Sequence, residues 1–216
     1  MTFVNNVEPI LVGLVVALIL FERSRHTFKS RREFLDVLNP TGKRLGTYLI
    51  ETAPIFIYTV SVLICLFLYF YRYPDVLSGK VTRAFGILLF VCGMGLRRWA
   101  IRALGPSWTV YVAPPSHPDS LVTSAGPYKY LRHPYYLGST AEFFGLLMFL
   151  VGLGIASVIT AIQLVAYTVR ARAEEQQLLS KFNTEYAMYR NRVGGFLPKL
   201  EAGRHGGGCR AMTIRK

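Results

Sequence analysis

The stretch Gly126-Pro-Tyr-Lys-Tyr-Leu-Arg-His-Pro-Tyr-Tyr-Leu-Gly138 places an Arg-His-Pro corner, residues 132–134, directly before a long apolar run. A cation, an imidazole and a helix-starting proline at the edge of such a run are costly to keep for packing alone. This pattern is typical of a binding-site rim. We therefore expect the corner to lie at the cytoplasmic edge of a bilayer.

Long apolar runs dominate the rest of the chain. Of the 216 residues, 52% are hydrophobic and only 17% are charged. Four regions are long and apolar enough to suggest membrane spans, namely 4–21, 46–71, 81–96 and 137–169. The last region exceeds one span and breaks naturally at Gly152-Leu-Gly154, giving a hairpin of two helices. The sequence therefore predicts an all-α integral membrane protein with five transmembrane helices, the second kinked at Pro54.

The charge distribution predicts the topology. With alternating sides across five helices, 22 of the 25 Lys and Arg residues fall on one face. The positive-inside rule then puts the N-terminus outside and the C-terminus in the cytoplasm. The net charge of +13 favours contact with anionic membrane lipid over nucleic acid, because the basic residues flank apolar spans and show no groove-reading motif. The short front half suggests a prokaryotic cell membrane, and the oligomeric state stays open.

The chain divides into three parts. Residues 1–96 form a three-helix membrane region with a basic connector, residues 97–200 form the catalytic region, and residues 201–216 form a glycine-rich, disordered tail. Within the second part, residues 97–136 predict a long cytoplasmic segment in which several prolines forbid continuous helix. A connection of that length in a compact protein is usually functional.

The fourth predicted helix carries a carboxylate and a glycine stripe. Gly138, Gly145 and Gly152 recur every seven residues, so they form one face on which another backbone or a ligand can approach closely. Glu142 lies near that face by helical arithmetic and should point into the bundle. A carboxylate inside a span is a candidate for substrate binding. The alternative is that Glu142 pairs with one of the cytoplasmic arginines.

A second polar segment continues the fifth predicted helix out of the membrane. It begins at Arg170 and contains Glu174 and Glu175. Arg170 and Glu174 are four residues apart and share one helix face. One alternative is that the two side chains form an ordinary exposed ion pair on the helix surface. The other is that they form one wall of a pocket and the Arg-His-Pro corner forms the opposite wall.

Several short motifs together resemble the isoprenylcysteine carboxyl methyltransferase family of integral membrane methyltransferases, which has relatives that methylate phospholipid amines. The similarity covers roughly residues 97–200, and the order and spacing of the motifs make it specific. The matching pieces are Leu104-Gly-Pro-Ser-Trp108, Leu121-Val-Thr-Ser-Ala-Gly-Pro-Tyr128, Arg132-His-Pro-Tyr-Tyr136 and the tail Arg170…Glu174-Glu175…Glu185-Tyr186…Tyr189…Pro198.

The resemblance implies S-adenosylmethionine as cofactor, held in a cytoplasmic pocket between the loop before helix four and the C-terminal helix. It assigns acceptor-carboxylate binding to Arg170 and catalytic roles to Arg170, Glu174 and His133. One departure is Ser120, which stands where the family often has a His. With His117 nearby and an extra Ala125, the resemblance leaves the register of this loop open by about one residue. By position, the family's cofactor-binding residues fall on Leu121, Val122, Tyr128, His133, Pro134, Tyr135, Tyr136 and Glu174.

Other functions remain open at this point. The methyl acceptor could be the carboxylate of a prenylated cysteine, a phospholipid amine or another small lipophilic molecule. A membrane sterol-type reductase that uses NADPH would have the same helical architecture. A lipid-binding scaffold protein would have the same basic face, which would anchor it to the membrane. No metal site is expected, because His26, His117 and His205 lack metal-ligand spacing.

Overall fold

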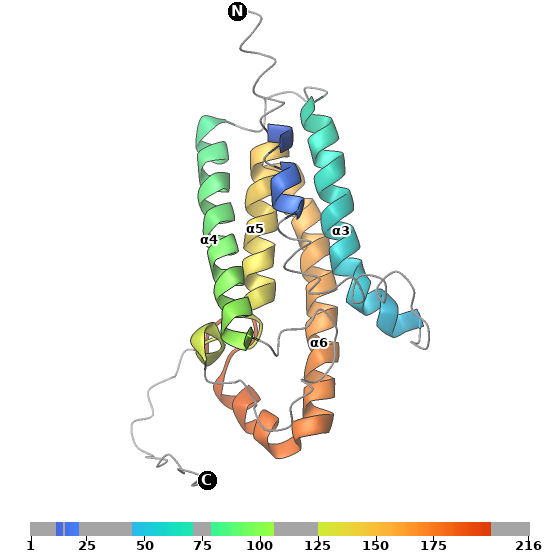
Figure 1. Cartoon of the computed structure of the whole chain (residues 1–216), viewed down its shortest axis with the longest axis vertical. Coiled ribbons are helices and arrows are strands. Elements are labelled where there is room, and N and C mark those ends of the chain that lie inside the picture. Colours follow the sequence, from blue (N-terminus) through green and yellow to red (C-terminus); the bar gives the residue numbers. More distant parts are fainter. Residues whose placement is uncertain (1–11, 15, 22–44, 71–78, 106–124, 200–216) are drawn as a thin grey trace, which may run out of the picture.

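A computed structural model describes residues 12–14, 16–21, 45–70, 79–105 and 125–199. Four long helices run alongside one another, and α5 lies at the centre of the bundle in contact with α3, α4 and α6 (Figure 1). The helical residues Val12–Phe21 lie on the same bundle, and Val16 joins its apolar core. The elements are α3 (Leu45–Phe70), α4 (Lys80–Leu104), the 3-10 turn η3 (Gly126–Lys129), α5 (Pro134–Val151) and α6 (Leu153–Arg192).

The all-helical architecture and the membrane-protein class are confirmed. By length and apolar composition, three of the described helices could cross a membrane: α3 from Tyr48, α4, and α6. Their outward faces expose large apolar side chains that a lipid environment would cover, among them Phe56, Leu63, Phe67, Phe85, Leu88, Val158 and Val165. The count of five spans stays a prediction, because the first expected span is described only from Val12 and α5 is not among the three.

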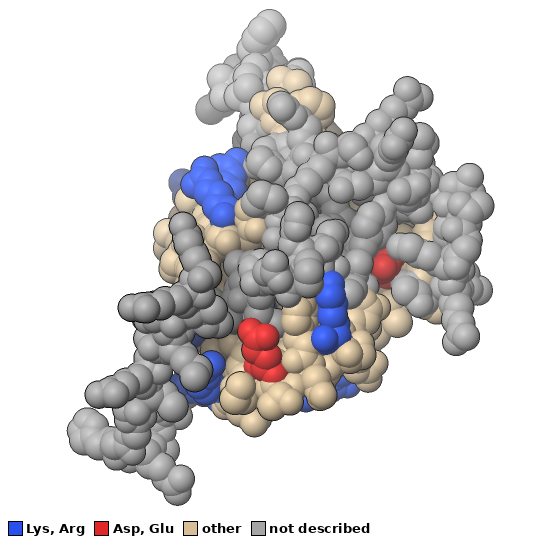
Figure 2. Space-filling model, turned by 60° about the horizontal axis from the view of Figure 1, so that its bottom comes forward, with Lys and Arg blue, Asp and Glu red and all other residues tan. Residues whose placement is uncertain are grey.

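One end of the bundle collects the basic side chains. The start of α3, the end of α4, the start of α5 and the end of α6 all lie at this end (Figure 1). Figure 2 views the molecule from here and shows basic side chains on several sides of an exposed acidic one. The exposed members are Arg102, Lys129, Arg172, Lys181, Arg190, Arg192 and Lys199.

The third predicted span was placed too short. We expected it to end at residue 96, where the charged residues begin, but α4 continues to Leu104. The charges do not end the helix because Arg97 is buried against Glu142 of α5 instead of facing solvent. The boundary between the first two predicted parts of the chain therefore falls inside α4.

Glycines bring α4 and α5 into backbone contact. A Cβ at Gly138 would lie 2.6 Å from the amide nitrogen of Arg97, and one at Gly86 would lie 2.8 Å from the carbonyl oxygen of Gly145. Gly93 has equally little space, because a Cβ there would meet the backbone of Glu142. Real Cβ atoms do not approach other atoms this closely, so only glycine allows the two helices to pack at this separation. The predicted glycine face is thus confirmed for Gly138 and Gly145.

Gly152 has a different role from the other two glycines of the predicted stripe. It ends α5 with φ +79° and ψ 174°, a conformation that residues with a side chain rarely adopt. The next helix starts immediately at Leu153, which confirms the predicted hairpin.

The last helix is interrupted near its end. Asn183 has φ +41° and ψ −111°, so α6 turns sharply there. Residues 184–199, called the closing arm below, run back towards the start of α5 (Figure 1). The sequence did not predict this turn.

We expect Gly93→Ala to destabilise the protein, because the added methyl group must push α4 away from α5. Overpacking of this kind costs about 1–3 kcal/mol, which thermal unfolding of the detergent-solubilised protein would detect as a lower midpoint.

Gly95→Ala is the matched control on the same helix, since a Cβ there meets nothing within 4 Å. Removing a helical glycine at an open position should leave stability unchanged or slightly higher. Equal losses in the two variants would contradict the proposed contact.

Candidate active site

The Arg-His-Pro corner is fixed by backbone bonds to the closing arm. Pro134 is the first residue of α5, where its missing N–H leaves no helical bond unmade. The amides of Arg132 and His133 donate to the carbonyls of Gly194 and Gly195, at 2.8 and 3.2 Å. A parallel β-bridge between Leu131 and Gly194 continues this pairing. The closing arm therefore pairs with the corner through its backbone, as one β-strand pairs with another.

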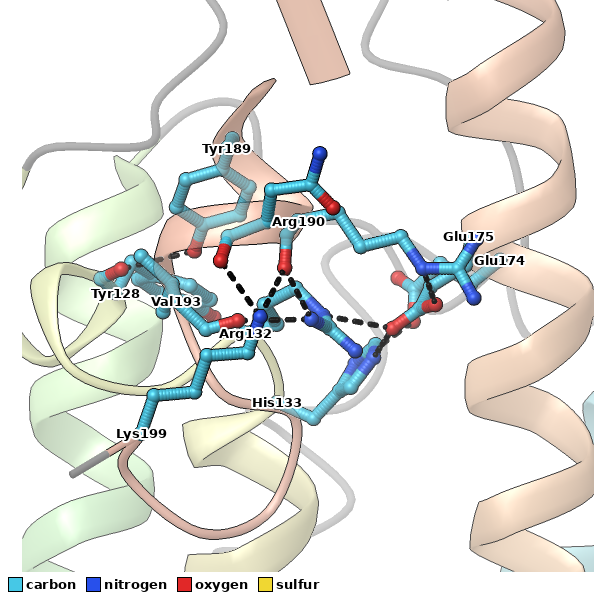
Figure 3. Close-up of polar contacts among 10 residues, drawn as sticks. Tyr128, Arg132, His133, Glu174, Glu175, Tyr189, Arg190, Val193 and Lys199 are labelled. Atoms are coloured by element: carbon cyan, nitrogen blue, oxygen red, sulfur yellow. Dashed lines mark hydrogen bonds and ion pairs between the residues drawn. The ribbon is translucent and has the colours of Figure 1, made fainter. Parts of the chain in front are cut away.

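Glu175 of α6 is the centre of the polar contacts (Figure 3). Its Oε1 accepts from Nε of Arg132 and from Nε2 of His133, both at 2.9 Å. Its Oε2 lies 3.3 Å from Nε of Arg190 in the closing arm. An ionised carboxylate only accepts hydrogen bonds, so Nε2 of His133 carries a hydrogen. One side chain thus joins the corner, α6 and the arm.

Further contacts hold the closing arm in place. Arg132 Nη1 donates to the carbonyls of Arg190 and Val193, at 2.9 and 2.8 Å. The hydroxyl of Tyr189 donates to the carbonyl of Tyr128 in η3, at 2.8 Å (Figure 3). Burial raises the pKa of Tyr189 to about 12, so this hydroxyl keeps the proton that it donates.

Glu174 has a setting different from that of its neighbour. Its side chain is 35% exposed, against 11% for Glu175. Its Oε2 accepts from the hydroxyl of Tyr136 at 3.0 Å and lies 3.8 Å from Nδ1 of His133. This carboxylate is therefore oriented by the corner while part of it stays accessible to a ligand.

An aromatic wall lines the start of α5. The ring of Tyr136 stacks on His133, with centroids 5.6 Å apart, and on Tyr167 of α6, at 4.9 Å. Tyr135 meets Tyr136 edge-on, and Phe196 of the closing arm packs on His133 at 5.5 Å. Flat apolar faces of this kind suit an aromatic ligand such as a purine base.

Arg170 also contacts Tyr136. Its guanidinium carbon is 5.9 Å from the centroid of the Tyr136 ring, a cation–π distance. Its Nη1 donates to the backbone carbonyl of Glu51 in α3 at 2.6 Å. Arg170 thus contacts the ring, and Glu174 the hydroxyl, of the same tyrosine.

The structure brings most of the predicted site residues together. Tyr128, His133, Pro134, Tyr135, Tyr136, Arg170 and Glu174 lie around the start of α5 and the facing part of α6. Leu121 and Val122 lie outside the described residues. The roles assigned to all of these residues stay predictions.

Glu142 does point into the bundle, as predicted. Its Oε2 lies 2.6 Å from Nε of Arg97, and both side chains are 1% exposed. Pairing with an arginine, one of the two alternatives, is therefore what the structure shows. A direct contact of Glu142 with substrate stays a prediction.

The sequence analysis gave no role to Tyr167, Arg97, Arg190 or Phe196. Two signals were present. Tyr167 precedes Arg170 by three residues and so shares its helix face, and a buried Glu142 demanded a cation on a neighbouring helix. Nothing in the sequence indicated that Arg190 and Phe196 return to the corner. Among the described residues, no group of three His, Cys, Asp or Glu side chains could hold a metal ion.

We expect Glu175→Ala to release the closing arm, because Arg132 and His133 lose their shared acceptor. The loss of a hydrogen bond to a charged group should lower stability by about 1.5–3 kcal/mol. Hydrogen exchange of the amides in residues 189–196 should increase. Gln176→Ala, at an exposed neighbouring position, is the control that should leave both measurements near wild type.

The same carboxylate predicts a pH dependence. Burial alone would raise the pKa of Glu175, but the hydrogen bond from His133 and the charge of Arg132 outweigh it and the pKa is lowered. A carboxyl with a lowered pKa stabilises the fold above its unfolded pKa of about 4.3, and that contribution is lost as pH falls through the folded value. The difference in unfolding midpoint between wild type and Glu175→Gln should therefore be largest near neutral pH and shrink below about pH 4. A difference in unfolding midpoint that does not change with pH would contradict the lowered pKa of Glu175.

The region that contains this site is similar to known proteins. Residues 86–180 match the model of the isoprenylcysteine carboxyl methyltransferase family. Three relatives carry the name protein-S-isoprenylcysteine O-methyltransferase. That of Saccharomyces cerevisiae is 26% identical, covering 91% of this chain and 90% of its own length. Those of Tribolium castaneum and Schizosaccharomyces pombe are 26% and 29% identical over 78% and 60% of this chain, and over 61% and 56% of their own.

No solved structure gives a significant match. The matched region contains the corner, the whole of α5 and both glutamates of α6. Through residues 86–180, this chain is similar to the isoprenylcysteine carboxyl methyltransferase family.

Proposed function

We propose that this protein transfers a methyl group from S-adenosylmethionine to the carboxylate of an isoprenylcysteine-like acceptor. The observation that carries the proposal is the contact of Tyr136 with two charged side chains. Its hydroxyl donates to Glu174, and its ring lies beside the guanidinium of Arg170. A residue suited to the methyl donor and a residue suited to a carboxylate acceptor therefore share one wall.

The side chains on the Glu174 side fit the donor. A partly exposed carboxylate accepts hydrogen bonds from ribose hydroxyls or an ammonium group. The stacked rings of His133 and Tyr136 offer an aromatic face to adenine. Pro134, Tyr135 and Tyr128 belong to the same end of the bundle, and the family resemblance adds Leu121 and Val122 to the residues expected to bind the donor.

The side chains on the Arg170 side fit the acceptor. A guanidinium binds a carboxylate through two parallel hydrogen bonds and fixes its orientation. S-adenosylmethionine, when bound, supplies a methyl group that is already activated by a positively charged sulfur. A carboxylate acceptor needs no general base, so the residues of this chain act by orienting the reactants and excluding water.

The surroundings agree with a lipophilic acceptor. The bundle exposes apolar faces to the bilayer, and the site lies at its basic end (Figure 1). With the N-terminus outside, this end faces the cytoplasm. A prenyl chain could then stay in the bilayer while its carboxylate reaches Arg170.

Calorimetric titration with S-adenosylhomocysteine tests the donor side. We expect saturable binding to wild type and binding about tenfold to a hundredfold weaker for Glu174→Ala, as for the loss of hydrogen bonds to a charged group. Gln176→Ala is the control and should bind like wild type. Absence of binding, or saturation by NADPH instead, would overturn the proposal.

The acceptor is tested separately by mass spectrometry of the methylated product. Incubation with the donor and an N-acetylated S-prenylcysteine should give the methyl ester, and Arg170→Gln should lower the yield. Methylation of phosphatidylethanolamine but not of the prenylcysteine would overturn the carboxylate acceptor.

A further inference from the structure

Three large apolar side chains are exposed at the basic end of the bundle, where the site lies. Trp99 lies near the end of α4, Tyr130 directly follows η3, and Leu197 lies in the closing arm. Their side chains are 49%, 56% and 76% exposed. Single exposed apolar residues are common on protein surfaces, but here each one is accompanied by an exposed basic residue of the same segment.

The basic residues lie close to the apolar ones in the chain. Arg102 follows Trp99 by three residues, so the two share one face of α4. Nζ of Lys129 lies 5.9 Å from the centroid of the Tyr130 ring, and the closing arm exposes Arg192. The six side chains, named the interfacial patch, are Trp99, Arg102, Lys129, Tyr130, Arg192 and Leu197.

The three segments of the interfacial patch are in contact with one another. A Cβ at Gly126 of η3 would lie 3.0 Å from Nε1 of Trp99, so η3 packs against the end of α4. The hydroxyl of Tyr189 in the arm donates to the carbonyl of Tyr128 in η3. All three segments lie at the same end of the bundle (Figure 1). The patch therefore joins neighbouring segments, one of which is the arm that packs on the site.

The interfacial patch lies where a helix of membrane-spanning length ends. α4 is long and apolar enough to cross a membrane, and Trp99 and Arg102 belong to its last turns. The ends of spans meet the lipid headgroups, where tryptophan and tyrosine rings are enriched. Glu185 is the one acidic residue in the sequences of α4, η3 and the arm. The patch thus offers positive charge to phosphate groups and apolar side chains to the acyl region beside them.

We propose that the interfacial patch binds the anionic headgroups of the bilayer and thereby holds the closing arm on the site. The arm brings Arg190 to Glu175 and Phe196 to the ring of His133. Lipid contacts made by the arm favour the position in which these contacts form. An anionic membrane therefore stabilises the closed arm and a neutral one does not, whatever the identity of the methyl acceptor.

Hydrogen exchange of the full-length protein in lipid nanodiscs tests this proposal. The amides of residues 189–196 should exchange more slowly in phosphatidylcholine mixed with phosphatidylglycerol than in phosphatidylcholine alone. One basic residue near an anionic surface is worth about a fivefold change in an equilibrium, so the exchange rates should differ by at least that factor. High salt should reduce the difference, because exposed charges are screened.

Substitutions at exposed basic residues locate the effect. Lys129→Gln and Arg192→Gln together should raise the exchange rate in anionic nanodiscs to that in neutral ones. Lys129→Gln alone should lose part of the lipid dependence. Lys80→Gln is the matched control, since it removes an exposed charge at the opposite end of α4, and it should keep the full dependence. The unfolding midpoint of the double variant in detergent should stay near wild type, because both side chains are exposed.

Equal exchange in the two kinds of nanodisc would overturn the proposal, as would a lipid dependence that the double variant retains. Inorganic phosphate, compared with chloride at the same ionic strength in neutral nanodiscs, should leave the exchange of the arm unchanged. An effect of phosphate as large as that of phosphatidylglycerol would also overturn the proposal, because the patch would then bind free anions without needing a membrane.

Discussion

The candidate site depends on the carboxylate of Glu175. It receives Arg132 and His133 from the start of α5 and Arg190 from the closing arm. Two guanidinium groups could not stay this close without a negative charge between them. Adjacent residues of a helix point about 100° apart, so the anchoring of Glu175 leaves Glu174 directed to Tyr136. Two consecutive carboxylates thereby acquire different settings: Glu175 holds segments together, and Glu174 stays partly exposed beside Tyr136.

The buried and half-buried arginines are stabilised by different kinds of partner. Arg97 forms an ion pair with Glu142 between α4 and α5, where glycines bring the backbones together. Arg132 combines a carboxylate with two backbone carbonyls. Arg170 contacts a carbonyl and an aromatic face. Because removal of one partner from a buried charge pair leaves a costly charge behind, the first two arginines are best understood as structural. The third combines burial with partners suited to a binding role.

Several features could be predicted from sequence because they depend on one helix at a time. Periodicity placed Glu142 inside the bundle, and the Gly152-Leu-Gly154 break placed the hairpin. The extension of α4 to Leu104 was missed because charged residues were interpreted as the end of a helix, whereas Arg97 has a buried partner on another helix. The turn at Asn183 has neither glycine nor proline to announce it. It depends on contacts between the arm and the corner, which pair residues about sixty positions apart and leave no periodic signal.

The two halves of the bundle are joined in physically different ways. Between α4 and α5, backbone meets backbone at glycines, so any added atom must move a helix. Between α3 and α6, the long side chains of Arg170 and Gln163 reach across to carbonyls beside a proline. Long side chains tolerate changes in helix separation that a glycine contact does not. Substitutions in α3 can therefore alter the setting of Arg170 while the α4–α5 pair and Glu174 keep their geometry.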